Sequence, residues 1–351
     1  MQPVRILIVD DSAVVRKVLN SLLASDPEIV VAGTAGNGSQ ALARIPEAKP
    51  DLVTLDIEMP GMDGLETLVE IRKLYPKLPV IMFSTLTERG ATATLDALAR
   101  GASDYVTKPS QGETREVSQA RVREELIRKI KSLCAVRVPR AQPPPPSAPT
   151  PTLASARPQA RIDVVAIGAS TGGPNALTAL IPQFPADFPV PIVIVQHMPP
   201  LFTRFLAERL QSGTELRVEE AADGAPVVAG TVLIAPGDYH MRVRSHNGET
   251  IVRLDQAPPE NSCRPSVDVL FRSVAETYGG AAISAILTGM GQDGLRGAEV
   301  LKANGAYVIA QDEATSVVWG MPGAVAGAGL ANCVLPLDAV VPEILRQVGK
   351  G

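Results

Sequence analysis

Short apolar runs alternate with amphipathic stretches along the first third of the chain. Four of these runs have the length of buried strands and end in polar residues: 5–11, 51–56, 79–84 and 103–109. Apolar residues recur at helical spacing in four further stretches: 14–23, 64–74, 88–99 and 116–133. Strands that alternate with helices are typical of a parallel sheet with helical crossovers. The pattern predicts an α/β domain over residues 1–125, with its last helix extending to about residue 135.

A proline-rich segment interrupts this alternation. Residues 139–158 contain eight prolines, with Ala, Ser, Thr and Gln between them. Such a composition cannot pack a core and favours an extended, semi-rigid spacer. We therefore predict a linker over residues 136–160 and a second domain over residues 161–351.

The same alternation restarts after the linker. Four runs are of the buried-strand type and end in polar or glycine-rich turns: 162–170, 191–198, 230–237 and 281–290. Helical patterns occupy the stretches 173–181, 201–210, 267–278 and 295–304. The predicted fold class is therefore α/β throughout, with two doubly wound parallel-sheet domains. The second domain is expected to be Rossmann-like, with three layers in the order αβα.

Composition narrows the functional classes. The chain of 351 residues is longer than one ordinary domain, and 45% hydrophobic residues supply ample core for two. A net charge of −4 gives no support for nucleic-acid binding, which needs a basic patch. No apolar run approaches the roughly 18 residues that a membrane span needs, and the run at 5–9 is too short for a signal peptide. Three scattered cysteines, Cys134, Cys263 and Cys333, predict reduced, inert thiols in a cytoplasmic protein.

Acidic residues gather at the predicted strand ends of the first domain. Asp10 and Asp11 close the first strand, Asp56 ends the next, and Ser84 and Lys108 end the other two. Because the carboxyl ends of parallel strands line one edge, these side chains should converge. Neighbouring carboxylates repel, and Mg²⁺, which prefers oxygen ligands, would neutralise them. One carboxylate could then accept a phosphoryl group, whose oxygens Ser84 and Lys108 would hold. A single such Asp is usually a solvated turn residue, but the ordered set predicts a phosphorylation switch.

These residues resemble those of a response-regulator receiver domain, which has a (βα)5 fold. The motifs that carry the resemblance are IVDDS (8–12), LDIEMPGMDG (55–64) and YVTKP (105–109). The resemblance implies that Asp56 accepts phosphate from a sensor histidine kinase. It also implies that Asp10 and Asp11 help Asp56 to hold Mg²⁺, and that Ser84 with Tyr105 relays the change.

A glycine-rich turn follows the first predicted strand of the second domain. The sequence GASTGG (168–173) fits the G-x-S-x-G nucleophile elbow, in which a tight turn exposes the hydroxyl of Ser170. The following helix would present free N–H groups to an oxyanion. The alternative is a dinucleotide-binding loop. It is disfavoured because the spacing is not G-x-G-x-x-G and because the next strand ends in Gln196-His197 rather than in an acidic residue for a ribose.

A serine nucleophile needs a base, and the chain contains three histidines. His197 follows the strand next to the elbow and is our choice. His240 follows another strand end and could line the same crevice, whereas His246 lies in a predicted exposed turn. Asp293, in the turn TGMGQDG (288–294), is the candidate for the orienting carboxylate, although a lone Asp in such a turn is ordinarily a helix cap.

The order Ser, His, Asp resembles that of the catalytic domain of the chemotaxis protein-glutamate methylesterases, the CheB family. The resemblance covers about residues 161–348 and includes IAPGDYHM (234–241) and RPSVDVLF (264–271). It implies that Ser170 is the nucleophile, His197 the general base and Asp293 its orienting partner. The backbone N–H groups of Thr171 and Met290 would form the oxyanion hole.

Together the resemblances imply a phosphorylation-activated serine esterase. It would hydrolyse glutamate methyl esters and deamidate glutamines on chemoreceptors, which gives sensory adaptation in a two-component chemotaxis pathway. Chemoreceptors and a sensor histidine kinase are the implied partners. The esterase chemistry needs no cofactor, no nucleic acid or membrane insertion is expected, and the protein is expected to be monomeric and cytoplasmic.

Three questions stay open at this point. Cys263 stands before RPSVD where the family more often has His, which leaves open how this segment meets substrate. The second domain could instead be a nucleotide-binding output module, or the whole chain a non-catalytic adaptor with a decayed triad. The missing ribose carboxylate disfavours the first alternative and the complete triad disfavours the second. Because both sites fall at carboxyl strand edges, we also expect the unphosphorylated receiver to pack over the esterase crevice.

Overall fold

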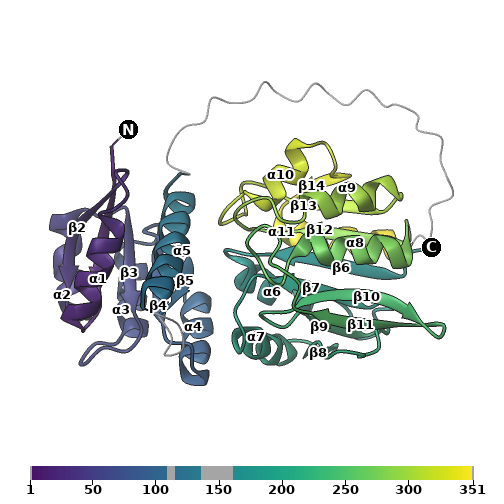
Figure 1. The fold of residues 1–351 in the computed structure, drawn as a ribbon, viewed down its shortest axis with the longest axis horizontal. Coiled ribbons are helices and arrows are strands. Elements are labelled where there is room, and N and C mark those ends of the chain that lie inside the picture. Colours follow the sequence, from purple (N-terminus) through teal and green to yellow (C-terminus); the bar gives the residue numbers. More distant parts are fainter. Residues whose placement is uncertain (1, 109–114, 136–160, 350–351) are drawn as a thin grey trace.

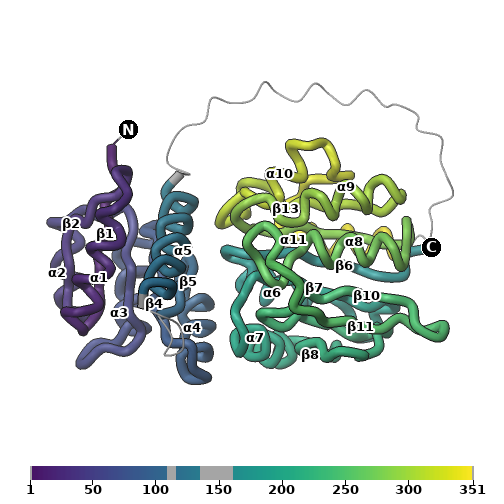
Figure 2. Tube along the Cα trace, in the orientation of Figure 1, coloured from purple at the N-terminus to yellow at the C-terminus, as the bar shows by residue number. Residues whose placement is uncertain are grey.

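The computed structural model describes residues 2–108, 115–135 and 161–349 (Figure 1). The predicted linker at 136–160 lies outside the described residues. The described chain forms two α/β bodies, each built on a parallel sheet, and α4 and α5 of the first body face the second. Figure 2 follows the chain through both bodies in the same orientation. The predicted fold class is confirmed.

The first sheet has five strands in the order β2-β1-β3-β4-β5, and all neighbours are parallel. Its strands are β1 Val4–Val9, β2 Ile29–Ala35, β3 Leu52–Asp56, β4 Val80–Ser84 and β5 Asp104–Thr107. Its helices are α1 Ala13–Leu23, α2 Gly38–Ala48, α3 Gly64–Leu74, α4 Glu88–Ala99 and α5 Arg115–Ala135. The strand order reverses between β1 and β3, so a crevice is expected at their carboxyl ends.

The second sheet has seven strands in the order β14-β13-β12-β6-β7-β9-β8, again with parallel neighbours. Its strands are β6 Val164–Ala169, β7 Ile192–Gln196, β8 Arg217–Glu220, β9 Thr231–Ile234, β12 Ala282–Ile286, β13 Tyr307–Gln311 and β14 Cys333–Leu335. Its helices are α6 Gly173–Leu180, the 3-10 turn η1 Ile181–Gln183, α7 Phe202–Gln211, α8 Val267–Tyr278, α9 Leu295–Ala303, α10 Met321–Gly327 and α11 Leu337–Val348. The order reverses between β6 and β12.

The central strand β6 shows why this sheet has helices on both faces. Val165 and Ile167 pack into the core shared with α6, α7 and α11. Val164 and Ala166 alternate with them and pack into the core shared with α8, α9 and α10. Because successive strand residues point to opposite faces, an uninterrupted apolar strand needs a helical layer on each side. The three-layer αβα arrangement follows.

An antiparallel hairpin is added to this plan. It pairs β10 (His240–His246) with β11 (Glu249–Asp255), and it packs against α8. Its turn is Asn247-Gly248, both with positive φ, which suits the tight turn that joins twisted strands. The alternation of strand and helix did not predict this hairpin. Within the described parts of the chain, no helix is both long and apolar enough to span a membrane.

Candidate active sites on two sheet edges

Ser170 lies in a tightly packed turn between β6 and α6. Its N–H donates to Thr288 O at 3.0 Å, and the N–H of Gly173 donates to Ser170 O at 2.7 Å. Gly172 has φ of 79°, and a Cβ at Gly173 would collide with the side chain of Gln196. These close approaches explain the glycines of the predicted elbow. Gln196 itself donates to Ser170 O at 3.0 Å, so it helps to fix the turn at the position where a dinucleotide site would carry an acid.

His197 is brought next to this turn by strand pairing. Ala169 of β6 is in register with Gln196 of β7, so Ser170 and His197 follow a matched pair. The N–H of His197 also donates to Ala169 O at 3.1 Å. Its ring Nε2 lies 2.8 Å from Asp293 Oδ2. The structure thus joins His197 to Asp293 and puts Ser170 on the adjoining strand end. Among the described residues, no hydrogen bond links the Ser170 hydroxyl to the His197 ring.

The Asp293 carboxylate sits at the N-terminus of α8. Its Oδ2 accepts the Val267 N–H at 2.7 Å, and its Oδ1 accepts the Ser266 hydroxyl and the Asn261 amide, each at 2.8 Å. Burial alone would raise the pKa of Asp293, but His197 and these donors lower it below its ordinary value. The carboxylate therefore stays ionised and holds the ring of His197 in one orientation. The side chain is 2% exposed.

The residues that hold Asp293 do not follow from the sequence pattern. Ser266 and the start of α8 lie in the segment RPSVDVLF. This segment is part of the resemblance to the methylesterase family, but the sequence predicts no site residue in it. A serine before an amphipathic helix is the available signal. It points to an N-terminal cap, but not to a partner 27 residues later.

The other nitrogen of His197 faces a thiol. Cys263 Sγ lies 3.6 Å from His197 Nδ1, so the base contacts Asp293 on one side and Cys263 on the other. Burial by itself would lower the pKa of His197, but Cys263 and Asp293 together raise it above its ordinary value. The scattered spacing of the cysteines, which predicts inert thiols, gives no sign of this contact.

The other two histidines have different surroundings. His240 is 1% exposed. Its Nδ1 accepts the Ser266 N–H at 3.3 Å and its Nε2 lies 3.2 Å from Pro258 O, so backbone groups use both ring nitrogens. His246 is exposed at the end of β10 beside the hairpin turn. His240 is therefore occupied by backbone groups, and His246 lies at the exposed end of the hairpin. His197 instead follows the strand next to the Ser170 turn and contacts Asp293, which favours His197 as the base.

The predicted oxyanion donors are available. In the part of the chain that the structure describes, no acceptor meets the backbone N–H of Thr171 or of Met290. The two residues follow β6 and β12, which are neighbouring strands. The Thr171 carbonyl accepts the Thr288 hydroxyl at 2.9 Å, which ties the two turns together. Their roles as oxyanion donors remain a prediction.

A second cluster lies at the carboxyl edge of the first sheet. Carboxylate oxygens of Asp10, Asp11 and Asp56 all lie within 4.8 Å of one another. Lys108 Nζ lies 2.8 Å from Asp56 Oδ1 and 3.4 Å from Asp10 Oδ2. Among the described residues, that buried Asp10 oxygen has no hydrogen-bond partner. Three converging carboxylates, one with a buried oxygen that accepts no hydrogen bond within the described structure, fit Mg²⁺, which takes oxygen ligands and balances their charge.

Burial is the main influence on Asp56. It raises the pKa of the carboxyl to about 6, with a further rise from Asp10, while Lys108 acts in the opposite direction. A cation at the cluster would favour the ionised form and so a nucleophilic carboxylate. Lys108 remains charged, since its contacts with Asp56 and Asp10 outweigh the effect of its own burial and raise its pKa.

The predicted relay residues point away from this cluster. The Ser84 hydroxyl donates to Gly90 O at 3.1 Å, in the first turn of α4. Tyr105 is buried and its ring stacks on Phe202 of α7, with centroids 4.9 Å apart and planes at 6°. Tyr105 therefore contacts the second domain directly in this state.

The α4–β5–α5 face of the receiver-like domain lies against the Ser170 turn. Asp104 Oδ2 accepts the Thr171 hydroxyl at 2.7 Å, in a buried contact. The Ser132 hydroxyl of α5 lies 2.7 Å from Met290 Sδ. Val318 shares a core with Val122 and other apolar residues of α5. Both turns that carry predicted oxyanion donors therefore contact this face. Figure 1 shows α4 and α5 on the side of the first domain that faces the second.

Charged pairs flank the same contact. Arg209 of α7 pairs with Asp96 at 2.8 Å, and Arg204 pairs with Glu88 at 2.6 Å. These pairs are partly exposed, so each contributes little on its own. The buried contacts around Thr171 and Phe202 therefore carry most of the specificity of the packing.

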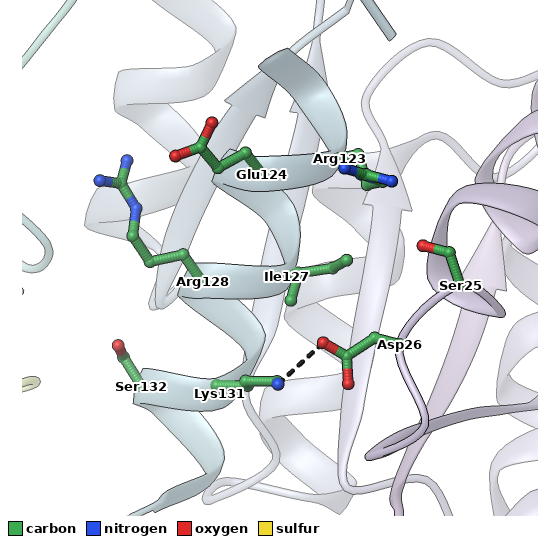
Figure 3. Close-up of a pocket in the computed structure, with 8 residues that line it drawn as sticks. All are labelled: Ser25, Asp26, Arg123, Glu124, Ile127, Arg128, Lys131 and Ser132. Atoms are coloured by element: carbon green, nitrogen blue, oxygen red, sulfur yellow. Dashed lines mark ion pairs between the residues drawn. The ribbon is translucent and has the colours of Figure 1, made fainter. Parts of the chain in front are cut away.

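A shallow pocket on the first domain lies beside α5, and Ser132, which lines it, also contacts Met290. It lies between the turn after α1 and one side of α5, and an ion pair between Lys131 and Asp26 at 2.8 Å crosses it (Figure 3). The residues that line it are Ser25, Asp26, Arg123, Glu124, Ile127, Arg128, Lys131 and Ser132. None of them is a predicted site residue.

Comparison with known proteins supports the interpretation of both domains. The family model for the CheB methylesterase matches residues 165–344, and that for the response regulator receiver domain matches residues 6–118. A protein-glutamate methylesterase/protein-glutamine glutaminase of Trichodesmium erythraeum is 50% identical over 99% of this chain and 100% of its own length. One of the same name from a Nocardioides species is 53% identical over 100% and 97%. The crystal structure of the Thermotoga maritima CheB methylesterase catalytic domain is 46% identical, with a TM-score of 0.52, and covers 53% of this chain and 99% of that domain.

Proposed function

The chain belongs to the CheB methylesterase family with a receiver domain in front, and from this premise we propose that phosphorylation switches on its esterase. The enzyme is a protein-glutamate methylesterase and protein-glutamine glutaminase. It acts on glutamate methyl esters and glutamines of chemoreceptor signalling helices, and its output is sensory adaptation. The single observation that supports the esterase most directly is the His197–Asp293 pair at 2.8 Å, at the end of the strand next to the Ser170 turn.

The chemistry follows from which ring nitrogen is occupied. Nε2 of His197 is bonded to Asp293, so Nδ1 is the atom that takes the proton of Ser170. Ser170 attacks the ester carbonyl, and the ionised Asp293 stabilises the imidazolium that forms. His197 then protonates the leaving group, methanol from an ester or ammonia from an amide, and water resolves the acyl-enzyme.

The oxyanion of each tetrahedral intermediate needs fixed donors. The N–H groups of Thr171 and Met290 are unoccupied donors on neighbouring strand ends in the described structure. Donors of this kind contribute on the order of 10²–10³ in rate each when they point to the developing charge. Substrate binding is expected to bring Ser170 and His197 into hydrogen-bond distance, since such contacts often tighten only in the complex.

The receiver domain supplies the control. A sensor histidine kinase donates the phosphoryl group to Asp56. Asp10, Asp11 and Asp56 would hold Mg²⁺, which would supply positive charge to balance the phosphoryl oxygens. In the unphosphorylated state the α4–β5–α5 face covers Thr171 and Met290 and hinders receptor entry. Phosphorylation draws Ser84 and Lys108 toward the phosphate, moves β5 and α4, and weakens the contact. We place this cytoplasmic enzyme, acting as a monomer, in a chemotaxis-type two-component pathway.

The test is a direct assay on receptors. Purified protein is incubated with membranes that contain methyl-labelled chemoreceptors, and methanol release is measured with and without acetyl phosphate and Mg²⁺. We expect slow release at rest and faster release with the phosphodonor. No release under either condition would overturn the esterase assignment, and equal release would overturn the control by phosphorylation.

A further inference from the structure

Cys263 lies on a strained loop that points its side chain at the catalytic base. Asn261 and Ser262 have φ of 53° and 62°, a region that residues with a Cβ rarely adopt. Glu260 and Cys263 exchange backbone hydrogen bonds at 3.1 and 2.9 Å, which closes the turn. Backbone strain of this kind persists only where surrounding contacts enforce it.

Such contacts are present on both sides of the turn. Arg272 binds both carboxylate oxygens of Glu260, at 2.8 and 2.6 Å. The Asn261 amide bridges Asp268 and Asp293, each at 2.8 Å. The loop is therefore locked to α8 and to the catalytic carboxylate. As a result, Cys263 Sγ is held 3.6 Å from His197 Nδ1, and the residue is partly exposed.

The pairing of thiol and imidazole has a chemical consequence. An imidazole at hydrogen-bond distance can take the thiol proton, and the resulting imidazolium stabilises the thiolate. Asp293 on the far side of the ring stabilises the same imidazolium. The thiolate, not the thiol, is the form that reacts with disulfides.

The other cysteines lack this setting. The Sγ of Cys333 meets the Tyr307 hydroxyl at 3.7 Å, and burial raises the pKa of this thiol. Cys134 packs beside the apolar core under α5. Among the three cysteines, only Cys263 has a histidine in contact in the described structure.

We propose that Cys263 is a site of reversible modification by low-molecular-weight disulfides, and that its modification turns off the esterase. The Cys263 thiolate attacks one sulfur of the disulfide and forms a new S–S bond. The old S–S bond breaks, and the second sulfur leaves with its electron pair and takes the proton that His197 had accepted. The adduct then occupies the space beside Nδ1, so His197 can no longer reach Ser170. The loss of activity rests on the proposed function, whereas the modification itself does not.

The first experiment measures the modification without any assay of activity. Full-length protein is incubated with 2-hydroxyethyl disulfide, and the site and rate of adduct formation are followed by peptide mass spectrometry. We expect Cys263 to react first and a small thiol to remove the adduct. His197→Gln keeps the size of the side chain but removes the proton acceptor, and it should slow the reaction at Cys263 roughly tenfold. Faster reaction at Cys134 or Cys333, or no effect of His197→Gln in a folded protein, would overturn the proposal.

The second experiment connects the adduct to activity. Methyl ester hydrolysis is compared before and after treatment in wild type, in Cys263→Ser and in the matched control Cys134→Ser/Cys333→Ser. Wild type and the control should lose activity in proportion to the adduct and regain it with a thiol, while Cys263→Ser should keep its own starting rate. Equal loss in Cys263→Ser, or full activity in modified wild type, would overturn the second half of the proposal. An absence of hydrolysis in untreated protein would instead count against the proposed function.

Discussion

The Asp104 carboxylate of the receiver domain accepts a hydrogen bond from the hydroxyl of Thr171, the residue directly after Ser170. Both residues are buried, at 5% and 4% exposure, and Lys129 pairs with the other Asp104 oxygen at 3.2 Å. A buried carboxylate, paired with Lys129, is thereby placed beside the turn whose backbone is predicted to stabilise an oxyanion. We propose that this packing restrains catalysis, because the Asp104–Thr171 contact covers the turn that carries a predicted oxyanion donor.

Asp104→Asn tests that relationship at nearly constant shape. Loss of the charge should weaken the contact with Thr171 and Lys129, and resting ester hydrolysis should rise about fivefold, within the range of ordinary coupling energies. The matched control is Asp96→Asn, which removes a partly exposed pair with Arg209 and should change the rate by less than about twofold. Equal rates for wild type and a folded Asp104→Asn variant would show that Asp104 does not restrain the enzyme.

Removal of the receiver should have a larger effect. A fragment of residues 161–351 is expected to fold by itself, because the catalytic domain of a Thermotoga maritima relative was crystallised alone. We expect the fragment to hydrolyse receptor esters roughly 5- to 150-fold faster than the resting full-length protein, and to ignore acetyl phosphate. If the fragment and the resting protein have equal rates, the receiver only tethers the enzyme and steric inhibition should be abandoned.

Ser170→Ala isolates the nucleophile. The substitution removes Oγ but keeps the backbone contacts to Thr288 and Gly173, so the fold should survive. Methanol release should fall on the order of 10⁴–10⁶-fold, as for other members of catalytic triads. Far-ultraviolet circular dichroism serves as the folding control. Release within about tenfold of wild type would move the nucleophile to another residue.

Two variants test whether His197 or His240 is the general base. His197→Ala should reduce ester hydrolysis about as much as Ser170→Ala, since the two residues act as a unit. His240→Ala removes a buried ring that binds Ser266 and Pro258, so it should lower thermal stability more than the rate per folded molecule. The reverse pattern, with kcat lost in a stable His240→Ala variant, would make His240 the base.

Asp56→Asn tests the phosphoryl acceptor. The variant should take up no acid-labile phosphate from acetyl phosphate and Mg²⁺, while its basal ester hydrolysis remains. Labelling at wild-type level would move the acceptor to Asp10 or Asp11.

The raised pKa of Asp56 also predicts how the stability of the protein depends on pH, and the same variant tests this. The pKa of Asp56 is raised from 3.8 to about 6 in the folded protein, so between these values the folded state binds more protons than the unfolded state. Without Mg²⁺, the wild type should therefore gain stability as pH falls from above 6 toward 4, and Asp56→Asn should lack this gain. The melting temperature of Asp56→Asn should exceed that of the wild type by a few degrees at pH 8, but not at pH 5. Mg²⁺ should close that difference.

The sequence predicts an element best where the pattern within that one strand or helix is sufficient to identify it. The ranges 88–99 and 267–278 coincide with α4 and α8, because each has a regular apolar stripe and a polar residue just before it. The hairpin β10–β11 is not predicted, although Asn247-Gly248 is a strong turn signal. An alternation of strands and helices predicts a helix after each strand and not a second strand. The residues around His246 are therefore predicted only as an exposed turn.

The site is predictable only as far as the sheet edge determines it. Parallel strand ends bring Ser170, His197 and Asp293 to one place, so their order along the chain is sufficient to nominate them. The surroundings of Asp293 and the contact of Cys263 with His197 depend on how the loop before α8 folds back. No local pattern encodes that path. The catalytic roles themselves remain predictions that the variants above will decide.

Strand β5 carries Asp104 at its start and is followed directly by Lys108, so one short segment touches both Thr171 and Asp56. Effects that pass through it must be reciprocal, because thermodynamic linkage has no direction. If a phosphoryl group on Asp56 favours release of Thr171, then a receptor bound at Ser170 must favour a phosphorylated Asp56 by the same factor. Well-methylated receptors would then raise the phosphorylated fraction of the enzyme that they engage, and that fraction would report on how much substrate is left.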